Sequence, residues 1–434
     1  MLAKLLLYFK LAGVVLQVIG GEVRRAWRFR SVRKLAAKSG STPSAERTKN
    51  IVVIGASFSG HYAARILARS LPPKSNYRVV VVEPNSHFQF TWVLPRYCVA
   101  KNHEHKAFIP YGKYAAGSDG ALRWIKDRVV RIAEGSVELQ DSDEVVPFEY
   151  LVIATGAAVK SGLPSRVNNT EKKQGMELLR EMQNRIEAAN TVVVVGGGAA
   201  GVEVATDAKS LYPKKHVILV HSRAAVMHRF GKRLQESALE GLQRLEVEVI
   251  LEDRVTEEDD AAGMVTLRSG RKIQCDYFIN CTGQQPNSDV LTTLSPSSVS
   301  DSGYIKVKPT LQLADDKYPN IYSCGDVTDM EVPTPNARSA MQQSIVAADN
   351  ILLAIEGKAP TNVYTHKWPE SFIKLTLGLD RSVSHLSDGK TCLLFESKEK
   401  DEALMAAQCW KSLEQTPFED ESMHGEQTKA EIAV

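Results

Sequence analysis

The sequence predicts an α/β protein built from two βαβ units of the same design. Each unit has two continuous apolar runs, as expected of parallel strands that are buried on both faces. The runs are residues 51–54 and 77–82 in the first unit, the latter apolar apart from Arg78, and residues 192–195 and 217–220 in the second. Between the two runs a helical pattern extends to Leu67 in the first unit and to Ala208 in the second. Two such units in one chain predict two separate parallel sheets.

Length and composition are those of a soluble globular protein with more than one domain. The chain has 434 residues, of which 43% are hydrophobic and 24% charged, and this length is enough for two or three domains with their own cores. The formal net charge of +3 gives no reason to expect a nucleic acid as partner. The six cysteines show neither a CxxC pair nor another metal-type spacing. We therefore expect reduced thiols, no disulfide framework and no metal site.

The first glycine-rich turn, GASFSG, lies directly between a strand and a helix. Gly55 permits the tight turn and Gly60 lets the helix pack closely on the strand, so that backbone N–H groups and the helix N-terminus face a pyrophosphate. Ser57 stands where the fingerprint has its middle glycine, and its small hydroxyl can donate a hydrogen bond. Glu83 follows the second strand, where a carboxylate accepts both ribose hydroxyls. This turn predicts a Rossmann-like dinucleotide-binding domain.

The second turn, GGGAAG, keeps all three fingerprint glycines, Gly196, Gly198 and Gly201. The second strand of this unit is followed by His221 and not by an acid, so nothing repels a 2′-phosphate, and Arg223 could pair with one. NADPH is thus permitted beside NADH. The alternative is that His221 and Arg223 belong to a solvated loop.

The order of these and two further motifs resembles the two-dinucleotide-binding flavoproteins, a family that includes glutathione reductase, type II NADH dehydrogenases and apoptosis-inducing factor. The further motifs are the exit strands YLVIATG (150–156) and DYFINCTG (276–283), and the terminal NIYSCGD (320–326). The resemblance implies FAD on the first domain and NADH or NADPH on the second. It implies that Asp326 binds the ribityl or pyrophosphate region of FAD. The other cofactor-binding residues that it implies in these motifs are Thr155, Gly156, Gly283 and Gly325.

Two side chains are candidates for catalysis. Glu203, in the first turn of the second helix, either stabilises the helix dipole or accepts a hydrogen bond from the nicotinamide carboxamide. Gln342 lies in the segment PNARSAMQ (335–342), which is similar to the helix whose N-terminus faces the flavin in type II NADH dehydrogenases. Within the family, this segment and CWKSL (409–413) are most similar to the apoptosis-inducing-factor-like branch that includes ferroptosis suppressor protein. In that comparison Gln342 falls near flavin and quinone, while Arg338 replaces a second glutamine.

The cysteine pair that disulfide reductases of the family use is missing. The corresponding segment, FTWVLPRYC (90–98), contains Cys98 alone, and a lone thiol cannot form an internal disulfide. Electrons are therefore expected to leave the flavin directly, to a quinone, another small acceptor or oxygen, and we predict a quinone reached from a membrane surface. Aromatic residues late in the chain either line the acceptor pocket or form core or dimer contacts: Trp368, Phe372, Trp410 and Phe418. The alternative functions are a slowly turning redox sensor and a biosynthetic flavin oxidoreductase.

The first 40 residues combine an apolar stretch (5–19) with a basic one (24–38). They predict a helix whose residues 1–38 associate with a membrane surface, on the cytoplasmic side of the mitochondrial outer membrane, the ER or a lipid droplet. A mitochondrial presequence and a helix exposed to solvent or covering the core are the alternatives.

The remaining boundaries follow from the motifs. We expect a linker at 41–49, an FAD-binding domain at 50–160 and 284–365, an NAD(P)H-binding domain at 161–283, and a C-terminal α+β segment at 366–434 for the acceptor side or a homodimer interface. The polar stretch from Glu419 to Val434 predicts a frayed end.

Overall fold

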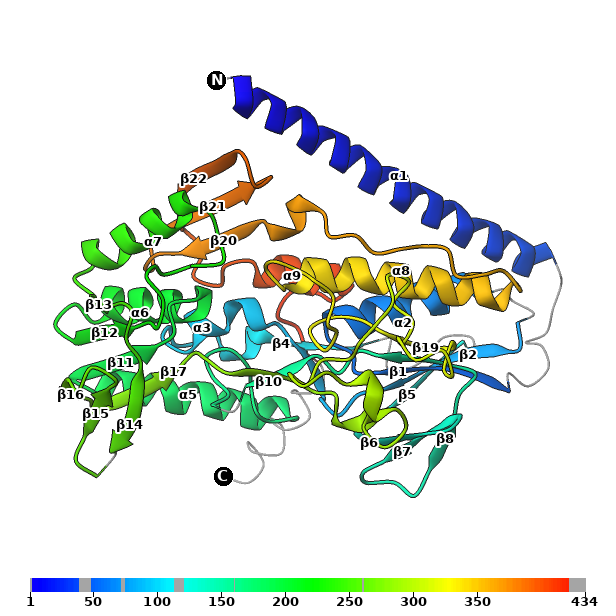
Figure 1. Ribbon diagram of the computed structural model, residues 1–434, viewed down its shortest axis with the longest axis horizontal. Coiled ribbons are helices and arrows are strands. Elements are labelled where there is room, and N and C mark those ends of the chain that lie inside the picture. Colours follow the sequence, from blue (N-terminus) through cyan, green and yellow to red (C-terminus); the bar gives the residue numbers. More distant parts are fainter. Residues whose placement is uncertain are drawn as a thin grey trace.

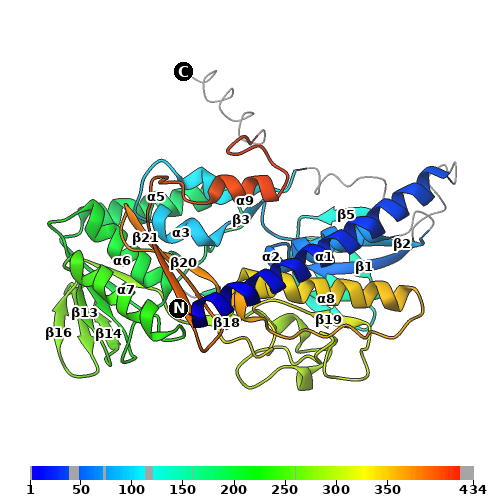
Figure 2. The ribbon, with the colours of Figure 1, turned by 90° about the horizontal axis from the view of Figure 1, so that it is seen from above.

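A computed structural model describes residues 2–38, 48–71, 75–112, 121–159, 161–259 and 261–420. Of the predicted linker, positions 41–47 lie outside these ranges, and so does the tail from residue 421 onward. Two lobes lie side by side in Figure 1, each built around one βαβ unit, and Figure 2 shows helix α1 (Leu2–Lys38) running from the C-terminal strands near the centre over the first lobe. The predicted α/β fold with two Rossmann-like units is confirmed.

The first lobe holds a five-stranded parallel sheet in the order β19-β9-β1-β2-β5. The strands are β1 (Lys49–Ile54), β2 (Tyr77–Val82), β5 (Leu122–Ile125), β9 (Tyr150–Ile153) and β19 (Ile321–Ser323). Helix α2 (Phe58–Ser70) follows β1 and packs against α8 (Ala337–Ile355). The chain therefore returns to this lobe with β19 and α8 after it has built the second lobe.

The strands of this sheet are buried on both faces, which explains their continuous apolar sequence. Val52 and Ile54 of β1 pack in one core cluster, whereas Ile51 and Val53 pack in another. All four are at most 4% exposed. Since successive side chains of a strand point to opposite faces of a sheet, two covered faces require an apolar residue at every position.

The second lobe repeats this design with a four-stranded parallel sheet in the order β13-β12-β11-β17. The strands are β11 (Thr191–Val195), β12 (His216–Val220), β13 (Glu248–Ile250) and β17 (Tyr277–Asn280). The helices of this lobe are α5 (Lys172–Ala188), α6 (Ala199–Leu211) and α7 (Lys232–Arg244).

Smaller antiparallel sheets and short helices complete the structure. One three-stranded sheet consists of β6 (Val129–Ala133), β7 (Ser136–Leu139) and β8 (Val145–Pro147). A second consists of β14 (Val255–Asp259), β15 (Met264–Leu267) and β16 (Lys272–Gln274). The third, called the C-terminal sheet, consists of β20 (Ile373–Thr376), β21 (Arg381–Ser387) and β22 (Cys392–Lys398). The two-stranded ones pair β3 (His87–Gln89) with β4 (Phe108–Pro110), and β10 (Ala157–Val159) with β18 (Gln284–Pro286). Short α-helices are α3 (Leu94–Tyr97) and α9 (Ala406–Ser412), and 3₁₀ turns are η1 (Thr91–Val93), η2 (Glu104–Ala107), η3 (Asp289–Leu291), η4 (Pro296–Ser298) and η5 (Trp368–Ser371).

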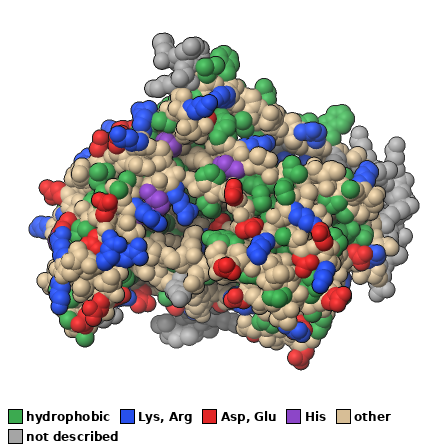
Figure 3. All heavy atoms as spheres, in the orientation of Figure 1, with side chains coloured by type: hydrophobic (Ala, Val, Ile, Leu, Met, Phe, Trp, Pro, Cys, Tyr) green, Lys and Arg blue, Asp and Glu red, His purple; other side chains and the backbone are tan. Residues whose placement is uncertain are grey.

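Helix α1 packs against α2 and β22 and leaves most of its apolar side chains exposed. Leu7 is buried, and Lys10 forms an ion pair with Asp388, in the turn between β21 and β22. Phe9, Leu16 and other apolar residues of the helix are exposed, and green side chains follow the upper edge of Figure 3, where α1 runs. Residues Leu6–Trp27 form the one helix in the described ranges that is long and apolar enough to cross a membrane, by length and composition.

The C-terminal stretch is anchored further along than its polar sequence predicts. Asp420 is buried, and its carboxylate accepts hydrogen bonds from Lys172 Nζ at 2.5 Å and pairs with His87 Nε2 at 2.9 Å. The prediction of a frayed end from Glu419 is therefore wrong at Asp420, because two buried basic side chains from distant parts of the chain supply the partners that the local sequence lacks. The rest of the predicted frayed end lies outside the described residues.

Candidate functional site

One large cavity, of about 1990 Å³, extends between the two lobes and reaches both glycine-rich turns. Most of the predicted site residues line it. From the first lobe these are Gly55, Ser57, Glu83, Thr155, Gly156, Gly325 and Asp326, and from the second Gly196, Gly198, Glu203, Arg223 and Gly283. The tertiary structure thus gathers residues from seven separate sequence segments around one space.

The first and third fingerprint glycines of both turns are required by backbone conformation or by space. Gly55 and Gly196 have φ values of +89° and +114°, which L side chains rarely adopt. A Cβ atom on Gly60 or Gly201 would lie 1.9 Å from the carbonyl oxygen of Gly55 or Gly196, respectively. These third glycines do not line the cavity; they let the helix approach the strand, as predicted.

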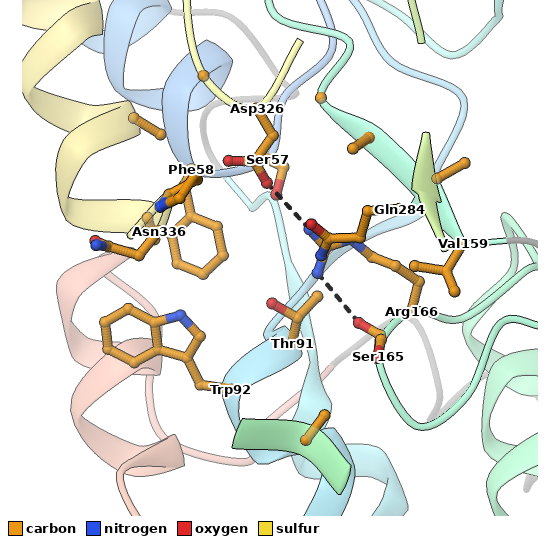
Figure 4. Close-up of a pocket in the computed structure, with 18 of the residues that line it drawn as sticks. Ser57, Phe58, Thr91, Trp92, Val159, Ser165, Arg166, Gln284, Asp326 and Asn336 are labelled. Atoms are coloured by element: carbon orange, nitrogen blue, oxygen red, sulfur yellow. Dashed lines mark hydrogen bonds and ion pairs between the residues drawn. The ribbon is translucent and has the colours of Figure 1, made fainter. Parts of the chain in front are cut away.

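The middle position of each turn has room for a side chain, which accounts for Ser57. A Cβ atom on Gly198 would meet nothing within 4 Å. Ser57 occupies the same place in the first turn, as N-cap of α2, and its hydroxyl makes no capping hydrogen bond. It faces the cavity (Figure 4) and remains able to donate to a bound phosphate.

Two acids of the first lobe, Glu83 and Asp326, have different hydrogen-bonding partners. Glu83 is 3% exposed and accepts hydrogen bonds from the backbone N–H groups of Ala56 and Asn85 and from the Asn85 side chain. Burial raises the pKa of Glu83, and these hydrogen bonds oppose the shift. Asp326 lies across the cavity and pairs at 3.3 Å with Arg166 Nη2 (Figure 4). Both residues line the cavity, where their carboxyl groups can accept hydrogen bonds from hydroxyl groups of a ligand.

The second lobe presents basic side chains to the cavity at the end of β12. His221, Arg223, His228 and Arg229 all line it, and the rings of the two histidines lie 5.3 Å apart. Burial lowers the pKa of both histidines, and the neighbouring Arg223 lowers it further. His221 Nδ1 accepts a hydrogen bond from Gly197 N at 3.1 Å, so its ring is fixed on the glycine turn. Lys, Arg and His side chains gather on the left half of the face in Figure 3.

Glu203 is held in the cavity wall by the C-terminal sheet. Its Oε1 accepts hydrogen bonds from Thr376 N at 3.1 Å and Thr376 Oγ1 at 3.2 Å. Burial raises the pKa of Glu203 to about 8, and the hydrogen bonds from Thr376 oppose the shift. A carboxyl group with this pKa can carry or release a proton near neutral pH.

One helical turn further along α6, a buried ion pair joins the three parts of the protein. Arg96 Nε donates to Asp207 Oδ2 at 2.7 Å, and Arg96 Nη2 donates to the carbonyl oxygen of Gly378 at 3.1 Å. Both charged side chains are at most 1% exposed. Arg96 lies in segment 90–98, in which Cys98 is the one cysteine, so this segment contributes a buried ion pair and no redox disulfide.

An aromatic wall faces the glycine turn of the first lobe. The rings of Phe58 and Trp92 stack with centroids 5.8 Å apart (Figure 4). The guanidinium of Arg338 lies 4.9 Å from the Trp92 ring centroid and 5.0 Å from that of Phe372, and donates to the Phe372 carbonyl at 2.7 Å. All four side chains line the cavity. They form an aromatic wall with one cation embedded in it.

Among the four late aromatic residues, the structure places Phe372 at the cavity and the other three away from it. Trp410 is fully buried and its indole donates to the Lys106 carbonyl at 2.9 Å, while Phe418 packs on its ring. Trp368 begins the 3₁₀ turn η5 and does not line the cavity. Trp410 and Phe418 thus contribute to the core, as the alternative interpretation stated.

The structure corrects the position of the candidate glutamine. Gln342 does not line the cavity, whereas Gln343 does, and its Oε1 accepts a hydrogen bond from Gly325 N at 2.7 Å. Consecutive residues of an α-helix point about 100° apart, so only one of the two can face the same side as Ser339 and Ala340, which also line the cavity. Sequence similarity located the helix correctly but not its rotation.

All six cysteines are free thiols. Burial raises the pKa of the Cys98 thiol well above its ordinary value, which makes this thiol a poor nucleophile at neutral pH. The expectation that no internal disulfide relays electrons is therefore consistent with the arrangement of segment 90–98.

The comparisons with known proteins agree with this geometry. Residues 49–349 match the family described as pyridine nucleotide-disulphide oxidoreductase. The chain belongs to this family. Its members bind FAD and use NADH or NADPH, so the protein is an FAD-dependent NAD(P)H oxidoreductase, and the glycine turns with their positive φ values fit the two dinucleotides.

Relatives of this pyridine nucleotide-disulphide oxidoreductase include Fe-regulated protein 8 of Mycosarcoma maydis, which is 35% identical over 79% of this chain and 90% of its own length. Ferroptosis suppressor protein 1 of Xenopus tropicalis is 27% identical over 87% of this chain and 99% of its own length. Among solved structures, the sulfide:quinone oxidoreductase of Aquifex aeolicus has a TM-score of 0.68 at 16% identity and covers 84% of this chain and 90% of that one. The resemblance to the ferroptosis suppressor branch is confirmed.

Proposed function

We propose that the protein is an NAD(P)H:quinone oxidoreductase that works at a membrane surface. The observation that carries this proposal is the aromatic wall of Phe58, Trp92 and Phe372 beside the cavity, in a protein without a cysteine pair to relay electrons. A flat, apolar acceptor can stack on such a wall, whereas a disulfide substrate would have no partner thiol. Similarity to a sulfide:quinone oxidoreductase and to ferroptosis suppressor protein 1 supports the choice.

The first lobe, residues 50–160 and 284–365, binds FAD. The second lobe, residues 161–283, binds the electron donor. The first glycine turn, Ser57 and Asp326 hold FAD, and the second turn holds NADH or NADPH. When bound, FAD supplies the redox chemistry, because it accepts a hydride from the nicotinamide and passes two electrons to the acceptor. The chain contributes the geometry that brings both rings and the acceptor together.

Glu203 has the position and proton affinity of a group that orients the nicotinamide. It lines the cavity at the start of α6, directly after the second glycine turn, and Thr376 fixes its carboxyl group. With its pKa raised to about 8 by burial, it is largely protonated at neutral pH, so one oxygen can donate a hydrogen bond to a carboxamide oxygen while the other accepts from Thr376.

Arg338 serves the acceptor side. Its guanidinium is fixed between two aromatic rings and by the Phe372 carbonyl, at the N-terminus of α8 where Asn336 caps the helix. A cation and a helix N-terminus at the same place stabilise negative charge that develops on a reduced ring or on a quinone oxygen.

The four basic residues at the end of β12 favour NADPH as donor. Arg223, His228 and Arg229 line the cavity, and the carboxylate that would repel a 2′-phosphate is replaced by His221. An arginine binds a phosphate through two parallel hydrogen bonds, so Arg223 and Arg229 together make a suitable phosphate site.

Helix α1 provides the contact with the membrane in this proposal. Its exposed apolar residues, Phe9, Leu16 and Trp27 among them, give a surface that can enter the headgroup region, and Arg24 and Arg30 can reach anionic lipids. Quinones with long apolar tails reside in the same phase, so a protein held at this surface meets its acceptor there.

Stopped-flow mixing tests the acceptor. Full-length protein with FAD, reduced under anaerobic conditions by NADPH, should be reoxidised rapidly by a soluble quinone analogue and slowly by glutathione disulfide or oxygen. Trp92→Ala should lower kcat/KM for the quinone by about tenfold, from the loss of ring stacking and apolar contact, and leave flavin reduction by NADPH unchanged.

Trp27→Ala is the matched control, because Trp27 is 71% exposed on α1 and is not among the residues that line the cavity. It should leave quinone reduction in solution unaffected. Equal reoxidation rates with and without quinone would contradict the proposal that a quinone is the electron acceptor.

A further inference from the structure

Helix α1 has two apolar sides that point in opposite directions. On one of them Leu7 is 1% exposed, and Leu11 and Val14 are half-buried. These positions follow the spacing i, i+4 and i+7, which places them on one side of a helix. We call it the inner side, because it is the part of α1 that is buried where the helix packs against α2 and β22.

The outer side of α1 is an exposed apolar stripe. Consecutive residues of a helix are about 100° apart, so that Phe9 points about 200° away from Leu7. Four more apolar residues lie within about a quarter of the circumference around Phe9, and each of the five is between 49% and 71% exposed: Phe9, Leu16, Ile19, Val23 and Trp27. The stripe is about 27 Å long, at about 1.5 Å per residue.

An ion pair fixes the inner side to the C-terminal sheet. Asp388 lies in the turn between β21 and β22, and its side chain is 7% exposed. Its Oδ1 accepts hydrogen bonds from the backbone N–H groups of Lys390 and Thr391, so the turn orients the carboxylate. Its Oδ2 pairs with Nζ of Lys10. The hydrogen bond from Lys10 lowers the pKa of Asp388 to about 2, so the carboxylate stays charged near neutral pH.

The same sheet forms part of the cavity wall. β22 pairs with β21, and β21 pairs with β20. Lys374 and Thr376 of β20 line the cavity, and so does Phe372, directly before this strand. One three-stranded sheet therefore connects α1 to the aromatic wall.

The charges of α1 suit the surface of an anionic bilayer better than its interior. Residues 2–38 contain nine basic residues and one acidic residue. Arg24 and Arg30 are exposed, and basic side chains beside an apolar stripe bind anionic headgroups. A helix that crossed the bilayer would turn its inner side to lipid as well, which would separate Lys10 from Asp388 and leave that ammonium without its counter-ion in the apolar segment. A helix that lies flat places only the stripe in lipid.

We propose that α1 lies flat in the headgroup interface of an anionic bilayer, with its outer stripe in lipid and its inner side docked on the protein, and that the pair of Lys10 and Asp388 latches it to the C-terminal sheet. The docked helix fixes how the protein sits on the bilayer, and the sheet holds the aromatic wall in a constant position relative to that surface. An acceptor with a long apolar tail then reaches the wall from the bilayer. This last step rests on the proposed quinone acceptor, whereas the docking does not.

Accessibility of the N-terminus distinguishes a flat helix from a crossing one. Full-length protein with a protease-cleavable tag at its N-terminus is bound to sealed vesicles of phosphatidylcholine and phosphatidylserine. Added protease should remove the tag without detergent, because both ends of a flat helix stay outside the vesicle. A tag that is removed only after detergent opens the vesicles would overturn the proposal, and so would equally strong binding to vesicles of phosphatidylcholine alone.

Cross-linking with a carbodiimide tests the latch on the membrane. The reagent activates a carboxylate, and a neighbouring amine displaces the activated group to form an amide, with the reagent released as a urea. Mass spectrometry of the digested protein should find Lys10 joined to Asp388 in the same yield with and without vesicles. The exposed pair of Lys101 and Glu187, whose N and O atoms lie 2.6 Å apart, is the internal standard. Loss of the Lys10 cross-link on vesicles, with the standard unchanged, would show that α1 leaves the protein when it binds lipid and would overturn the docking.

Two variants test what the latch does for the acceptor. Lys10→Gln and Asp388→Asn should each lower the turnover of a long-tailed quinone in vesicles, relative to a soluble analogue, by up to about fivefold, the most that a half-exposed ion pair contributes to docking. They change the net charge in opposite directions, so a shared loss cannot come from attraction to the membrane as a whole. Gln17→Glu, at an exposed position of α1, is the matched control, because it changes the net charge as Lys10→Gln does and leaves the pair intact.

Unchanged ratios in Lys10→Gln and Asp388→Asn, or an equal loss in Gln17→Glu, would overturn the role of the latch. If the natural protein reduced neither quinone, the proposed acceptor would be wrong. Tag removal and cross-linking involve no acceptor, so they would still decide whether α1 is docked and lies flat.

Discussion

The buried pair of Arg96 and Asp207 gives the sharpest prediction about stability. Its partners come from the first lobe and from the second, and Arg96 also binds the Gly378 carbonyl of the C-terminal sheet. Both side chains are at most 1% exposed. Arg96 Nη1 and Asp207 Oδ1 are buried without a hydrogen-bond partner in the described part of the chain, so no other donor there can replace Arg96 at the Asp207 carboxylate.

Removal of one partner should therefore lower the free energy of unfolding by a large amount. Leaving a buried charge without its counter-ion typically costs about 3–5 kcal/mol, and we expect that loss in the free energy of unfolding for Asp207→Asn, which leaves the guanidinium unpaired. Arg96→Met should cost a similar amount near neutral pH. Burial already raises the pKa of Asp207 while Arg96 lowers it, so without Arg96 the carboxyl group takes up a proton more readily, and the cost should shrink as the pH falls.

Urea denaturation of the FAD-loaded protein, followed by fluorescence and circular dichroism, measures these losses. The double variant Arg96→Met with Asp207→Leu should be clearly more stable than the sum of the two single losses predicts, because it leaves no unpaired charge. Arg131→Met, which breaks the exposed pair with Glu138, should leave the free energy unchanged within error. Strictly additive losses, or single losses as small as that of the surface pair, would refute the reasoning.

Three further predictions follow from the site. Burial holds the pKa of Glu203 at about 8, above the ordinary 4.5, so the stability that its protonated form provides is lost as the pH rises from 4.5 through 8. In urea titrations at several pH values, the free energy of unfolding of Glu203→Gln should therefore rise relative to that of the natural protein over this interval. A relative fall would contradict the assignment. Arg223→Ala should raise KM for NADPH by about tenfold and leave KM for NADH nearly unchanged, and equal steady-state effects on both donors would exclude a 2′-phosphate contact. Deletion of residues 2–38 should abolish cosedimentation with anionic phospholipid vesicles while the rate with a soluble quinone analogue persists; undiminished cosedimentation would show that α1 is not the membrane contact.

The sequence by itself determined the two parallel sheets and the turns that open them. Continuous runs such as residues 192–195 can be satisfied only where a strand is covered on both sides. Gly55 and Gly196 mark the turns because their backbone conformation is open to glycine and strained for other residues. These properties are local, so a few consecutive residues are enough to reveal them.

Orientation around a helix or along an irregular stretch was decided by tertiary structure. The motif at the start of α8 was placed correctly, but Gln343 faces the cavity in place of Gln342, because one residue turns the side chain by about 100°. Asp420 lies in a polar stretch that predicts a frayed end, and yet it is buried against Lys172 and His87. Neither partner can be identified from its neighbours in the sequence.

The charged pairs were beyond sequence reasoning for the same reason. Arg96 and Asp207 are 111 positions apart, and Arg166 and Asp326 are 160 apart, so nothing in the local pattern of either residue indicates its partner. An arginine within the apolar segment LPRYCVA was the one visible signal, since a buried cation requires a counter-ion. Which carboxylate meets it depends on how two lobes and a C-terminal sheet pack together, and only the folded chain brings those groups within hydrogen-bonding distance.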